Sequence, residues 1–283
     1  MRYIGLDIGG TKILAAAAKA DGTIIRTIRH ETPQDLLTGL NLLKSFVTEL
    51  AENQPITAIG AAIGGQLDWR TGVVSPLHQP QWRNVPLKQI MENEFNCPFW
   101  LDVDTNVAAL GEYAQLPQPP ERLVYLTIST GCGGSMVVNG KLNRGWNGAH
   151  PEIGHMSVAY RCRFPEKISC ACGTPDCLEA LISGRGIERI YGKPAATLDD
   201  AEWAEVAFNL GQGLRNITTL YAPELIILGG GVAVGGGEKL LRPAISQMRE
   251  RLKLVPEPEV RLSENGQFSA LNGAIHIARF GQA

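Results

Sequence analysis

Apolar and polar positions alternate along the first thirty residues in the way that strands do. Three short runs, rich in β-branched residues and alanine, are separated by turns that contain glycine, and they occupy residues 3–8, 13–18 and 23–28. Turns this short join neighbouring antiparallel strands. The pattern therefore predicts a three-stranded meander at the N-terminus.

The spacing of the apolar residues changes from strand-like to helix-like at Asp35. From there to Asn53 the apolar residues fall three or four positions apart, which predicts an amphipathic helix. Shorter patterns then predict a strand, a loop-rich stretch, a helix, a strand and a helix, over residues 56–63, 66–86, 87–95, 99–103 and 107–114.

The same kind of pattern begins again after a proline-rich linker candidate at residues 116–121. Strand, glycine turn and strand recur, and a helix, a strand and a helix follow, over residues 123–129, 135–142, 201–221, 225–228 and 238–252. Because both halves start alike, we expect a mixed α/β fold of two related lobes. The N-terminal lobe, completed by a C-terminal helix, and the C-terminal lobe are expected to comprise residues 1–115 with 270–283 and residues 116–269.

Composition and charge exclude several classes of protein. The 283 residues carry 26 basic and 28 acidic side chains, so the net charge of −2 provides no basic field for nucleic acid or an anionic membrane. An apolar share of 44 % and a charged share of 19 % are typical of a globular protein. The N-terminus lacks a signal-peptide pattern, and the most apolar stretch, over residues 225–237, is too short to cross a bilayer. We expect a cytoplasmic protein that binds neither nucleic acid nor membrane.

The chain has 32 glycines, and many of them lie in clusters, several of which follow predicted strands. The first turn, Asp7-Ile8-Gly9-Gly10-Thr11-Lys12, combines an acid, two glycines, a hydroxyl and a cation. Backbone N–H groups of such a turn can face phosphate oxygens, Thr11 can add a donor, and Asp7 can hold Mg²⁺ through water. An ordinary hairpin turn is the alternative, because tight turns commonly use glycine.

Two further glycine turns follow strands in the second half of the chain. Ser129-Thr130-Gly131-Cys132-Gly133-Gly134 again combines hydroxyls with close glycines, and Gly229-Gly230-Gly231 could let a base or ribose lie against bare backbone, or could serve packing alone. Neither a Walker A pattern nor the Gly-x-Gly-x-x-Gly pattern of dinucleotide-binding folds occurs. A nucleotide site divided between two lobes fits the turns that do occur.

Asp104 follows the predicted strand over residues 99–103, near the lobe boundary. A sugar hydroxyl is a weak nucleophile at neutral pH, so a carboxylate that accepts its proton would assist phosphoryl transfer. Asp102 is the rival candidate, because residues two apart on a strand share a face. Capping is the alternative role, with Asp104 or Thr105 as the N-cap of a helix at Val107.

A cysteine cluster lies in a turn-rich segment at Cys170, Cys172 and Cys177. In a cytosolic chain such a cluster favours a metal ion over disulfides. Three thiolates need a fourth ligand for tetrahedral zinc, and the candidates, in order of preference, are His155, Cys162 and His150. A redox pair or simply buried thiols are the alternatives.

Other residues near the cluster could bind a substrate. If one ring nitrogen of His155 binds zinc, the other is free for a substrate hydroxyl. Glu152 and Glu179 would lie near the same spot, and carboxylates accept hydrogen bonds from paired sugar hydroxyls, although each glutamate taken singly is typical of a solvated surface. Cys97 and Cys132 are interpreted as packing residues.

Taken together, these segments resemble the ROK family of bacterial sugar kinases and repressors, within the actin-like ATPase superfold. The three glycine turns look like that family's two phosphate motifs and its adenosine motif, and the resemblance runs the whole length of the chain. The stretch Asp104-Thr105-Asn106-Val107-Ala108-Ala109-Leu110-Gly111-Glu112 resembles the catalytic stretch, which implies Asp104 rather than Asp102 as the base. His150-Pro151-Glu152-Ile153-Gly154-His155 and Cys170-x-Cys172-x4-Cys177-x-Glu179 resemble the sugar-binding and zinc signature.

The resemblance implies an ATP-dependent hexose kinase with two ribonuclease H-like lobes, a cleft between them, Mg²⁺ and structural Zn²⁺. Family members are often homodimers. The residues implied to contact the nucleotide are Asp7, Gly9, Gly10, Thr11, Lys12, Thr130, Gly131, Gly133, Gly229, Gly230 and Gly231. Those implied to contact the sugar are Gly65, Glu152, His155 and Glu179. Those implied to bind zinc are His155, Cys170, Cys172 and Cys177.

Three features depart from the commonest family pattern and bear on the choice of sugar. Val103 stands where an asparagine usually contacts the sugar, Gly64-Gly65 stands where Gly-Pro is frequent, and fourteen residues separate His155 from Cys170. The His150-Pro151-Glu152 form is similar to that of fructokinases, and the Cys-x-Cys form to that of glucokinases and N-acetylhexosamine kinases. Glucose, phosphorylated at its 6-hydroxyl, is the first expectation. Fructose, N-acetylmannosamine and N-acetylglucosamine are the alternatives.

Other classes of function are weighed against a kinase. A sugar-responsive repressor is disfavoured, because the chain starts at its first strand, without a preceding helix-turn-helix segment, and is not basic. A non-catalytic sugar-sensing protein is motivated by Val103. Polyphosphate also stays open as the phosphoryl donor, because glycine turns do not distinguish it from ATP.

Overall fold

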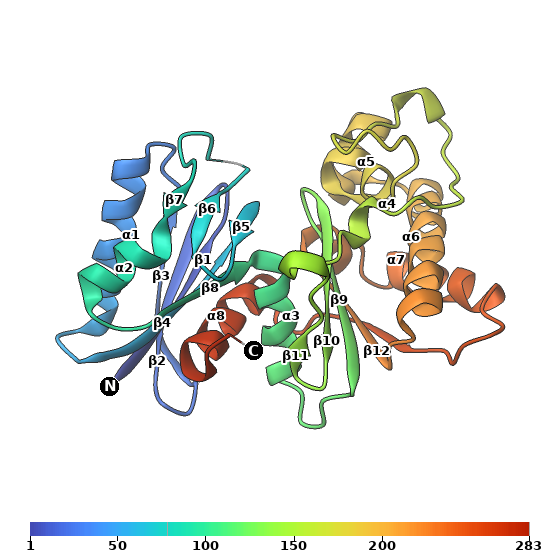
Figure 1. The fold of residues 1–283 in the computed structure, drawn as a ribbon. Coiled ribbons are helices and arrows are strands. Elements are labelled where there is room, and N and C mark those ends of the chain that lie inside the picture. The colour runs from blue at the N-terminus through green and yellow to red at the C-terminus, as the bar shows by residue number, and fades with distance from the viewer. Residues whose placement is uncertain (78, 283) are drawn as a thin grey trace. The chain divides into compact units, whose positions relative to one another are not determined.

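The computed structural model describes residues 1–77 and 79–282 of the chain. The chain forms two compact units, one of Met1–Pro117 with Phe268–Ala283 and one of Gln118–Gln267 (Figure 1). The backbone therefore passes from one unit to the other twice. Among the described residues, no helix combines the length and the apolar character that crossing a membrane requires.

The first unit is built on a five-stranded sheet with the order β3-β2-β1-β4-β8. β1, β2 and β3 are antiparallel neighbours, β4 is parallel to β1, and β8 is parallel to β4. In chain order these strands comprise Arg2–Ile8, Lys12–Ala18, Ile24–Glu31, Ile56–Ile63 and Phe99–Val103. The predicted meander and the two later strands are confirmed.

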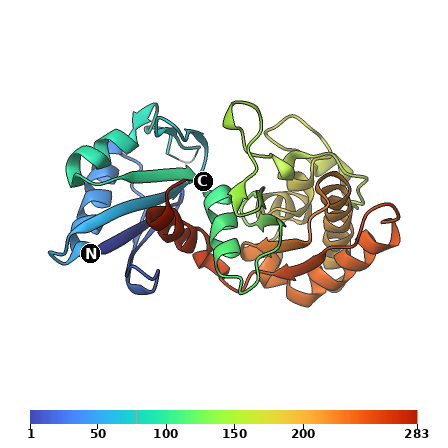
Figure 2. The same cartoon turned by 60° about the horizontal axis from the view of Figure 1, so that its bottom comes forward.

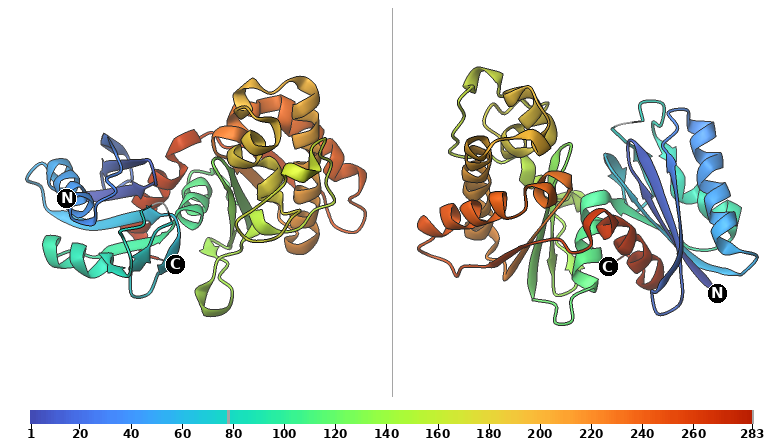
Figure 3. Two further views of the ribbon diagram at one scale, coloured as in Figure 1. Left: turned by 90° about the horizontal axis from the view of Figure 1, so that it is seen from above. Right: turned by 180° about the vertical axis from the view of Figure 1, so that it is seen from behind.

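Helices cover both faces of this sheet. α1 (Leu36–Ala51) and α2 (Leu87–Phe95) bury apolar side chains against one face, whereas α8 (Ser269–Phe280) packs against the other (Figure 3). α3 (Asp104–Ala114) lies against α8. The predicted start of the first helix at Asp35 is confirmed, because the Asp35 carboxylate accepts a hydrogen bond from Thr38 N.

Two glycines permit the close packing of α8. A Cβ atom at Gly60 of β4 would lie 2.0 Å from the carbonyl oxygen of Ala274, and one at Gly273 would lie 1.8 Å from that of Val107 in α3. Any side chain at either position would force the backbones apart. Because Gly60 and Gly273 have no side chain, the sheet, α3 and α8 can pack closely within one unit.

The second unit repeats the topology of the first. Its sheet has the order β11-β10-β9-β12-β13, with antiparallel pairing from β9 to β11 and parallel pairing from β9 through β12 to β13. In chain order the strands comprise Arg122–Ile128, Cys132–Val138, Lys141–Leu142, Leu225–Gly229 and Glu259–Leu262. The expectation of two related α/β lobes is confirmed.

The helices of the second unit share one apolar core with its sheet. Side chains of α6 and α7 pack with those of β9, β10 and β12 in that core. Figure 2 shows the backbone of the same unit from another side. The α-helices α4 to α7 comprise Leu178–Ile182, Gly184–Tyr191, Asp200–Tyr221 and Gly231–Glu250. The 3₁₀ turns η1 to η5 comprise Trp146–Gly148, Ile153–His155, Pro165–Lys167, Ala195–Thr197 and Gly266–Phe268.

Three predictions of local structure differ from the structure. The loop-rich stretch contains a small sheet of β5 (Gln66–Asp68), β6 (Val73–Ser75) and β7 (Val85–Pro86). α3 begins at Asp104 instead of Val107, and β10 begins at Cys132 instead of Ser135. α7 as a whole begins at Gly231, but the backbone of Gly237 is not helical, so a separate helical segment starts at the predicted residue 238. Glycine disfavours helices, which hides the first turns of α7, and burial of neighbouring apolar side chains outweighs that preference.

Candidate functional site

The first glycine turn is closed by its own backbone and braced by two side chains. Gly9 N donates to the carbonyl oxygen of Lys12 at 3.0 Å. The Gly9 carbonyl oxygen in turn accepts from Thr32 Oγ1 at 2.6 Å and from Gln79 Nε2 at 3.0 Å. Thr11 at its tip is exposed. The turn is therefore held in place by contacts that leave the Thr11 hydroxyl accessible.

Asp7 and Asp104 lie near each other at the carboxyl edge of the first sheet. Asp7 is near the end of β1, and Asp104 directly follows β8. Between these strands, β4 leads into Gly64, where a Cβ atom would lie 3.0 Å from Asp104 Oδ2. Burial, and then the charge of Asp104, raise the pKa of Asp7 to about 7, although Lys12 opposes the shift. Two carboxylates this close together repel each other, and a divalent cation bound between them would relieve that repulsion.

Asp102 points into the protein, whereas Asp104 is exposed. Asp102 is only 1 % exposed, and its Oδ1 accepts from Val103 N at 2.7 Å and from Asn106 Nδ2 at 2.9 Å. The shared strand face expected for the two acids does not exist, because the chain turns from strand to helix between them. Of these two acids, Asp104 is the one that a substrate could reach.

The capping alternative for Asp104 and Thr105 is also wrong. The N-cap of α3 is Val103, which makes no side-chain capping bond, so both residues already belong to the first turn of the helix. Asp104 Oδ1 accepts from Thr105 N at 2.7 Å. The start of a helix favours a negative charge through its dipole.

We expect Asp7→Asn to stabilise the protein at alkaline pH. The folded-state pKa of about 7 lies above the ordinary 3.8, so folding favours the protonated carboxyl. The stability from this group is full below about pH 4 and is lost as the pH rises through about 7. Asparagine cannot ionise, so the variant should melt about 3 °C or more above the wild type at pH 8, with a smaller gap at pH 5.

Thermal melts in Mg²⁺-free buffer at the two pH values measure these gaps. Asp104→Asn serves as the control background, because it removes one cause of the raised pKa of Asp7 and leaves burial, the larger cause. In the Asp104→Asn background, Asp7→Asn should raise the melting temperature at pH 8 by less than it does in the wild type. A gap independent of pH in the wild-type background would show that the pKa of Asp7 is not raised.

The second glycine turn is enclosed by the start of α4 and the junction of α4 with α5. Cys132 N donates to Glu179 Oε2 at 2.8 Å. Gly184 N donates to the carbonyl oxygen of Ser129 at 2.7 Å. Thr130 is exposed, and Gly131 is half-buried. The sequence indicated the glycines and hydroxyls of this turn but not the backbone donor at Gly184. The feature of the sequence that could have indicated it is Ser183, a residue type typical of a helix N-cap, which marks the start of α5.

The third glycine turn is explained in part by packing. A Cβ atom at Gly229 would lie 2.3 Å from Tyr125 Oη, and Gly230 has a φ of 87° with no room for a Cβ beside the carbonyl oxygen of Ile128. These observations favour the packing role for both residues. Gly231 differs, because it begins α7, is exposed, and has open space where a Cβ would be.

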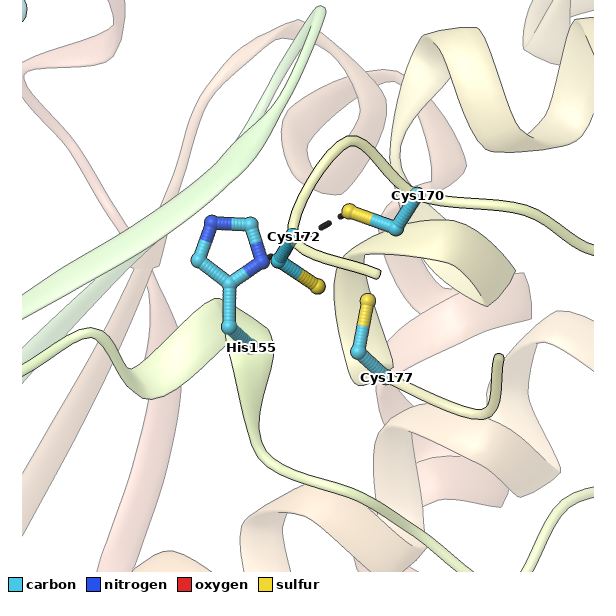
Figure 4. Close-up of side chains that lie close together, drawn as sticks. All are labelled: His155, Cys170, Cys172 and Cys177. Carbon is cyan, nitrogen blue, oxygen red and sulfur yellow. Dashed lines mark hydrogen bonds between the residues drawn. The ribbon is translucent and has the colours of Figure 1, made fainter. Parts of the chain in front are cut away.

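His155, Cys170, Cys172 and Cys177 come together in the second unit (Figure 4). One ligand atom from each lies within 4.8 Å of all the others, and Cys170 Sγ lies 3.7 Å from His155 Nδ1. Three thiols and one imidazole at this spacing fit a tetrahedral zinc ion. A hydrogen bond from Thr174 N is the main cause that lowers the pKa of Cys172 to about 7, which favours the thiolate that binds metal.

The other candidate ligands lie outside this cluster of described residues. His150 instead contacts Glu152, with 3.3 Å between His150 Nε2 and Glu152 Oε1. Cys162 is half-buried, and the carboxylates of Glu205 and Glu166 help to raise its pKa, after burial as the largest cause. Cys97 and Cys132 are buried in the cores of the first and second units, respectively.

The candidate sugar ligands differ in their surroundings. Glu152 is 61 % exposed and lies between two imidazoles, with its Oε2 at 3.9 Å from His155 Nε2. A hydrogen bond from His150 is the main cause that holds the pKa of Glu152 below its usual value. Cys170 Sγ lies on the Nδ1 side of the His155 ring, and Glu152 lies on its Nε2 side. Gly65 has a φ of 108° and lies tightly against the backbone of residues 76 and 77, which explains the glycine by conformation.

Comparisons with known proteins agree with this architecture. A fructokinase candidate of Bacillus subtilis is 33 % identical over 81 % of this chain and 76 % of its own length. An N-acetylmannosamine kinase of Vibrio cholerae is 32 % identical over 84 % of this chain and 86 % of its own. The crystal structure of a ROK family glucokinase from Streptomyces griseus, in complex with glucose and AMPPNP, is 29 % identical, with a TM-score of 0.82 over 99 % of this chain and 100 % of that one.

The extent of the structural match confirms the expected fold of two actin-like lobes. The sequence profile of the ROK family covers residues 3–280, from the first strand to the last helix. Because this match spans nearly the whole chain, the protein belongs to the ROK family.

Proposed function

We propose that this protein is an ATP-dependent sugar kinase that transfers the γ-phosphoryl group to the 6-hydroxyl of a hexose, with glucose as the preferred acceptor. The observation that carries the proposal is the exposed Asp104 carboxylate at the carboxyl edge of the first sheet, close enough to Asp7 to raise its pKa. Family membership supports a sugar kinase, and the AMPPNP and glucose of the Streptomyces griseus structure support ATP and a hexose as the two substrates.

Asp104 acts as the general base in this proposal. The 6-hydroxyl oxygen forms a bond to the γ-phosphorus while the bond from that phosphorus to the bridging oxygen of ADP breaks. The hydroxyl proton passes to the Asp104 carboxylate, which prevents a positive charge from developing on the attacking oxygen. The exposure of Asp104 permits this contact, and the burial of Asp102 argues against that residue in the same role.

Mg²⁺, when bound with ATP, would neutralise charge on the phosphates. Asp7 is proposed to hold it through water, and a cation there would favour the ionised carboxylate. The two glycine turns after β1 and β9 would offer phosphate donors at Gly10, Thr11, Lys12, Thr130, Gly131 and Gly133, whereas Gly9 N donates to the carbonyl oxygen of Lys12 and would shape the first turn. Of the third turn, Gly231 fits a nucleotide contact best, because it alone has open space at its Cβ position.

The sugar is proposed to bind Glu152 and the Nε2 side of His155, with Gly65 and Glu179 as further contacts. The cluster of His155 and three cysteines fits zinc, which would supply a structural cross-link rather than take part in phosphoryl transfer. Such a cross-link would hold the His155 ring with Nδ1 toward the metal and Nε2 toward Glu152.

A coupled assay of ADP release tests the reaction and the choice of sugar. Glucose, fructose, mannose and N-acetylmannosamine should be compared with ATP and with polyphosphate as donors. We expect activity that requires Mg²⁺ and has the highest kcat/KM with ATP and glucose. A higher value with fructose would instead favour the activity suggested by the Bacillus subtilis relative and the His150-Pro151-Glu152 form. Absence of phosphorylation with every sugar would point to a non-catalytic sugar-binding protein.

A further inference from the structure

Glu179 connects the second glycine turn to the cysteine cluster. It is the second residue of α4 and is half-buried. Its Oε2 accepts a hydrogen bond from Cys132 N at 2.8 Å, and its Oε1 lies 3.5 Å from Cys170 Sγ. A single carboxylate therefore contacts both the turn and one of the four metal-ligand candidates.

The turn packs closely around this carboxylate. A Cβ atom at Gly131 would lie 2.9 Å from Glu179 Oε2. On another side, a Cβ atom at Gly154 would lie 1.8 Å from the carbonyl oxygen of Cys132, so η2, which ends in His155, lies directly against the turn. The backbone of Cys132 is thus in contact with two segments that carry cluster residues.

The opposite end of the turn is held by the helix junction that follows α4. Gly184 N donates to the carbonyl oxygen of Ser129 at 2.7 Å, and Arg185 N donates to that of Thr130 at 3.2 Å. Cys177 is the N-cap residue of α4. A shift of Cys177 would therefore move α4, and with it the Glu179 carboxylate and the braces on Ser129 and Thr130.

We propose that Glu179 is a positioning residue that couples the metal cluster to the nucleotide turn. With a metal ion bound, Cys177 would be fixed at the N-cap of α4, and that helix would hold the Glu179 carboxylate that orients the Cys132 N–H. Cys170, as a thiolate ligand, would lie beside Glu179 Oε1 without donating to it. A hydrogen bond between an N–H group and a carboxylate is stronger than one between neutral groups, which suits it to this role. The inference rests on the proposed function, in which Thr130 and Gly131 contact a phosphate of ATP.

Calorimetric titration of the metal-loaded protein with Mg²⁺ and AMPPNP tests this coupling. Glu179→Ala should weaken AMPPNP binding about tenfold, as expected for loss of one hydrogen bond to a charged group. Glu179→Gln keeps an oxygen that can accept from Cys132 N and should bind within about threefold of wild type. Glu188→Ala, at an exposed glutamate of α5, is the matched control and should bind as wild type does.

A spectroscopic measurement tests the link to the metal directly. With Co²⁺ in the cluster, AMPPNP should change the thiolate absorption of the wild type and leave that of Glu179→Ala unchanged, because coupling between two sites acts in both directions. Should Glu179→Ala fold poorly, Glu179→Asp provides the second variant. Its carboxylate is one methylene shorter and would lie beyond hydrogen-bond reach of Cys132 N, so it should weaken AMPPNP binding while metal content stays at the wild-type value.

The outcomes separate this inference from the proposed kinase activity. If Glu179→Ala binds AMPPNP as wild type does, the coupling is wrong, and weaker glucose binding in the same variant would leave Glu179 with its sugar contact alone. If the wild type binds AMPPNP, loses that affinity in Glu179→Ala, and phosphorylates no sugar, the coupling holds and the kinase proposal fails. If the wild type does not bind AMPPNP, both are wrong.

Discussion

Asp104→Asn should lower kcat by about 10²–10⁴-fold, the usual contribution of a general base. Asparagine has nearly the same shape and can still accept from Thr105 N, so the start of α3 should be preserved. It cannot take a proton from a hydroxyl at neutral pH. Glucose binding, which precedes proton transfer, should remain within about threefold of wild type.

Steady-state kinetics and a glucose titration measure the two effects separately. Asp200→Asn removes the same charge from an exposed aspartate at the start of α6 and should leave kcat unchanged. Near-normal turnover in Asp104→Asn would remove Asp104 from the mechanism. A loss of glucose affinity as large as the loss of kcat would assign it to substrate binding instead.

Loss of the metal should cost the second unit much of its stability. The purified protein should contain about one zinc ion per chain. Cys177→Ser should reduce that content and lower the melting temperature by about 10 °C or more, because binding to a structural site contributes folding free energy directly. The segment from Cys170 to Cys177 contains short turns, such as the hydrogen bond from Gly173 N to the carbonyl oxygen of Cys170, and a single β-bridge between Cys177 and Ser157. Little else holds three thiols so close together.

Cys162→Ser is the matched control for this experiment, because Cys162 precedes the cluster in the same irregular segment and lies outside the group of four. It should keep both the zinc and the melting temperature. Elemental analysis and thermal melts with and without chelator measure the two quantities. A protein without zinc whose melting temperature is insensitive to chelator would contradict the structural metal site.

Most of the secondary structure could be predicted, because its causes are local. Strand alternation gave the meander before Asp35, and helical spacing from that residue gave α1 with its observed N-cap. The errors occur where local preference opposes packing. The glycines after residue 230 disfavour a helix, so the helical segment before the kink at Gly237 was not predicted, although Val232 and Ala233 are buried there; the segment after the kink starts at residue 238, as predicted.

From the residues alone, the candidate site could be predicted only in its residue types, whereas the resemblance to the ROK family implied Asp104 as the base and His155 as the fourth metal ligand. Asp102 and Asp104 are equivalent in a strand pattern, and burial separates them, since the chain turns into α3 between the two. His155 was the first of three candidates for the fourth metal ligand. One of its ring nitrogens lies within 4.8 Å of the thiol sulfurs, because the chain folds back after residues 156–169 and places the cysteines beside η2, which ends in His155. Glu179 was grouped with the sugar ligands, and no sequence signal indicated its hydrogen bond to Cys132 N.

The sequence by itself therefore determined the order of strands and helices, the glycine turns, the acids that follow strands, and the set of thiols and imidazoles available for a metal. The tertiary structure decided which acid is exposed, which histidine faces the cysteines, and which carboxylate holds the second turn. The physical reason is the separation along the chain over which each effect acts. Periodicity, turn preference and capping act over a few neighbouring residues, whereas exposure and the meeting of donors depend on packing between segments that are distant in the chain.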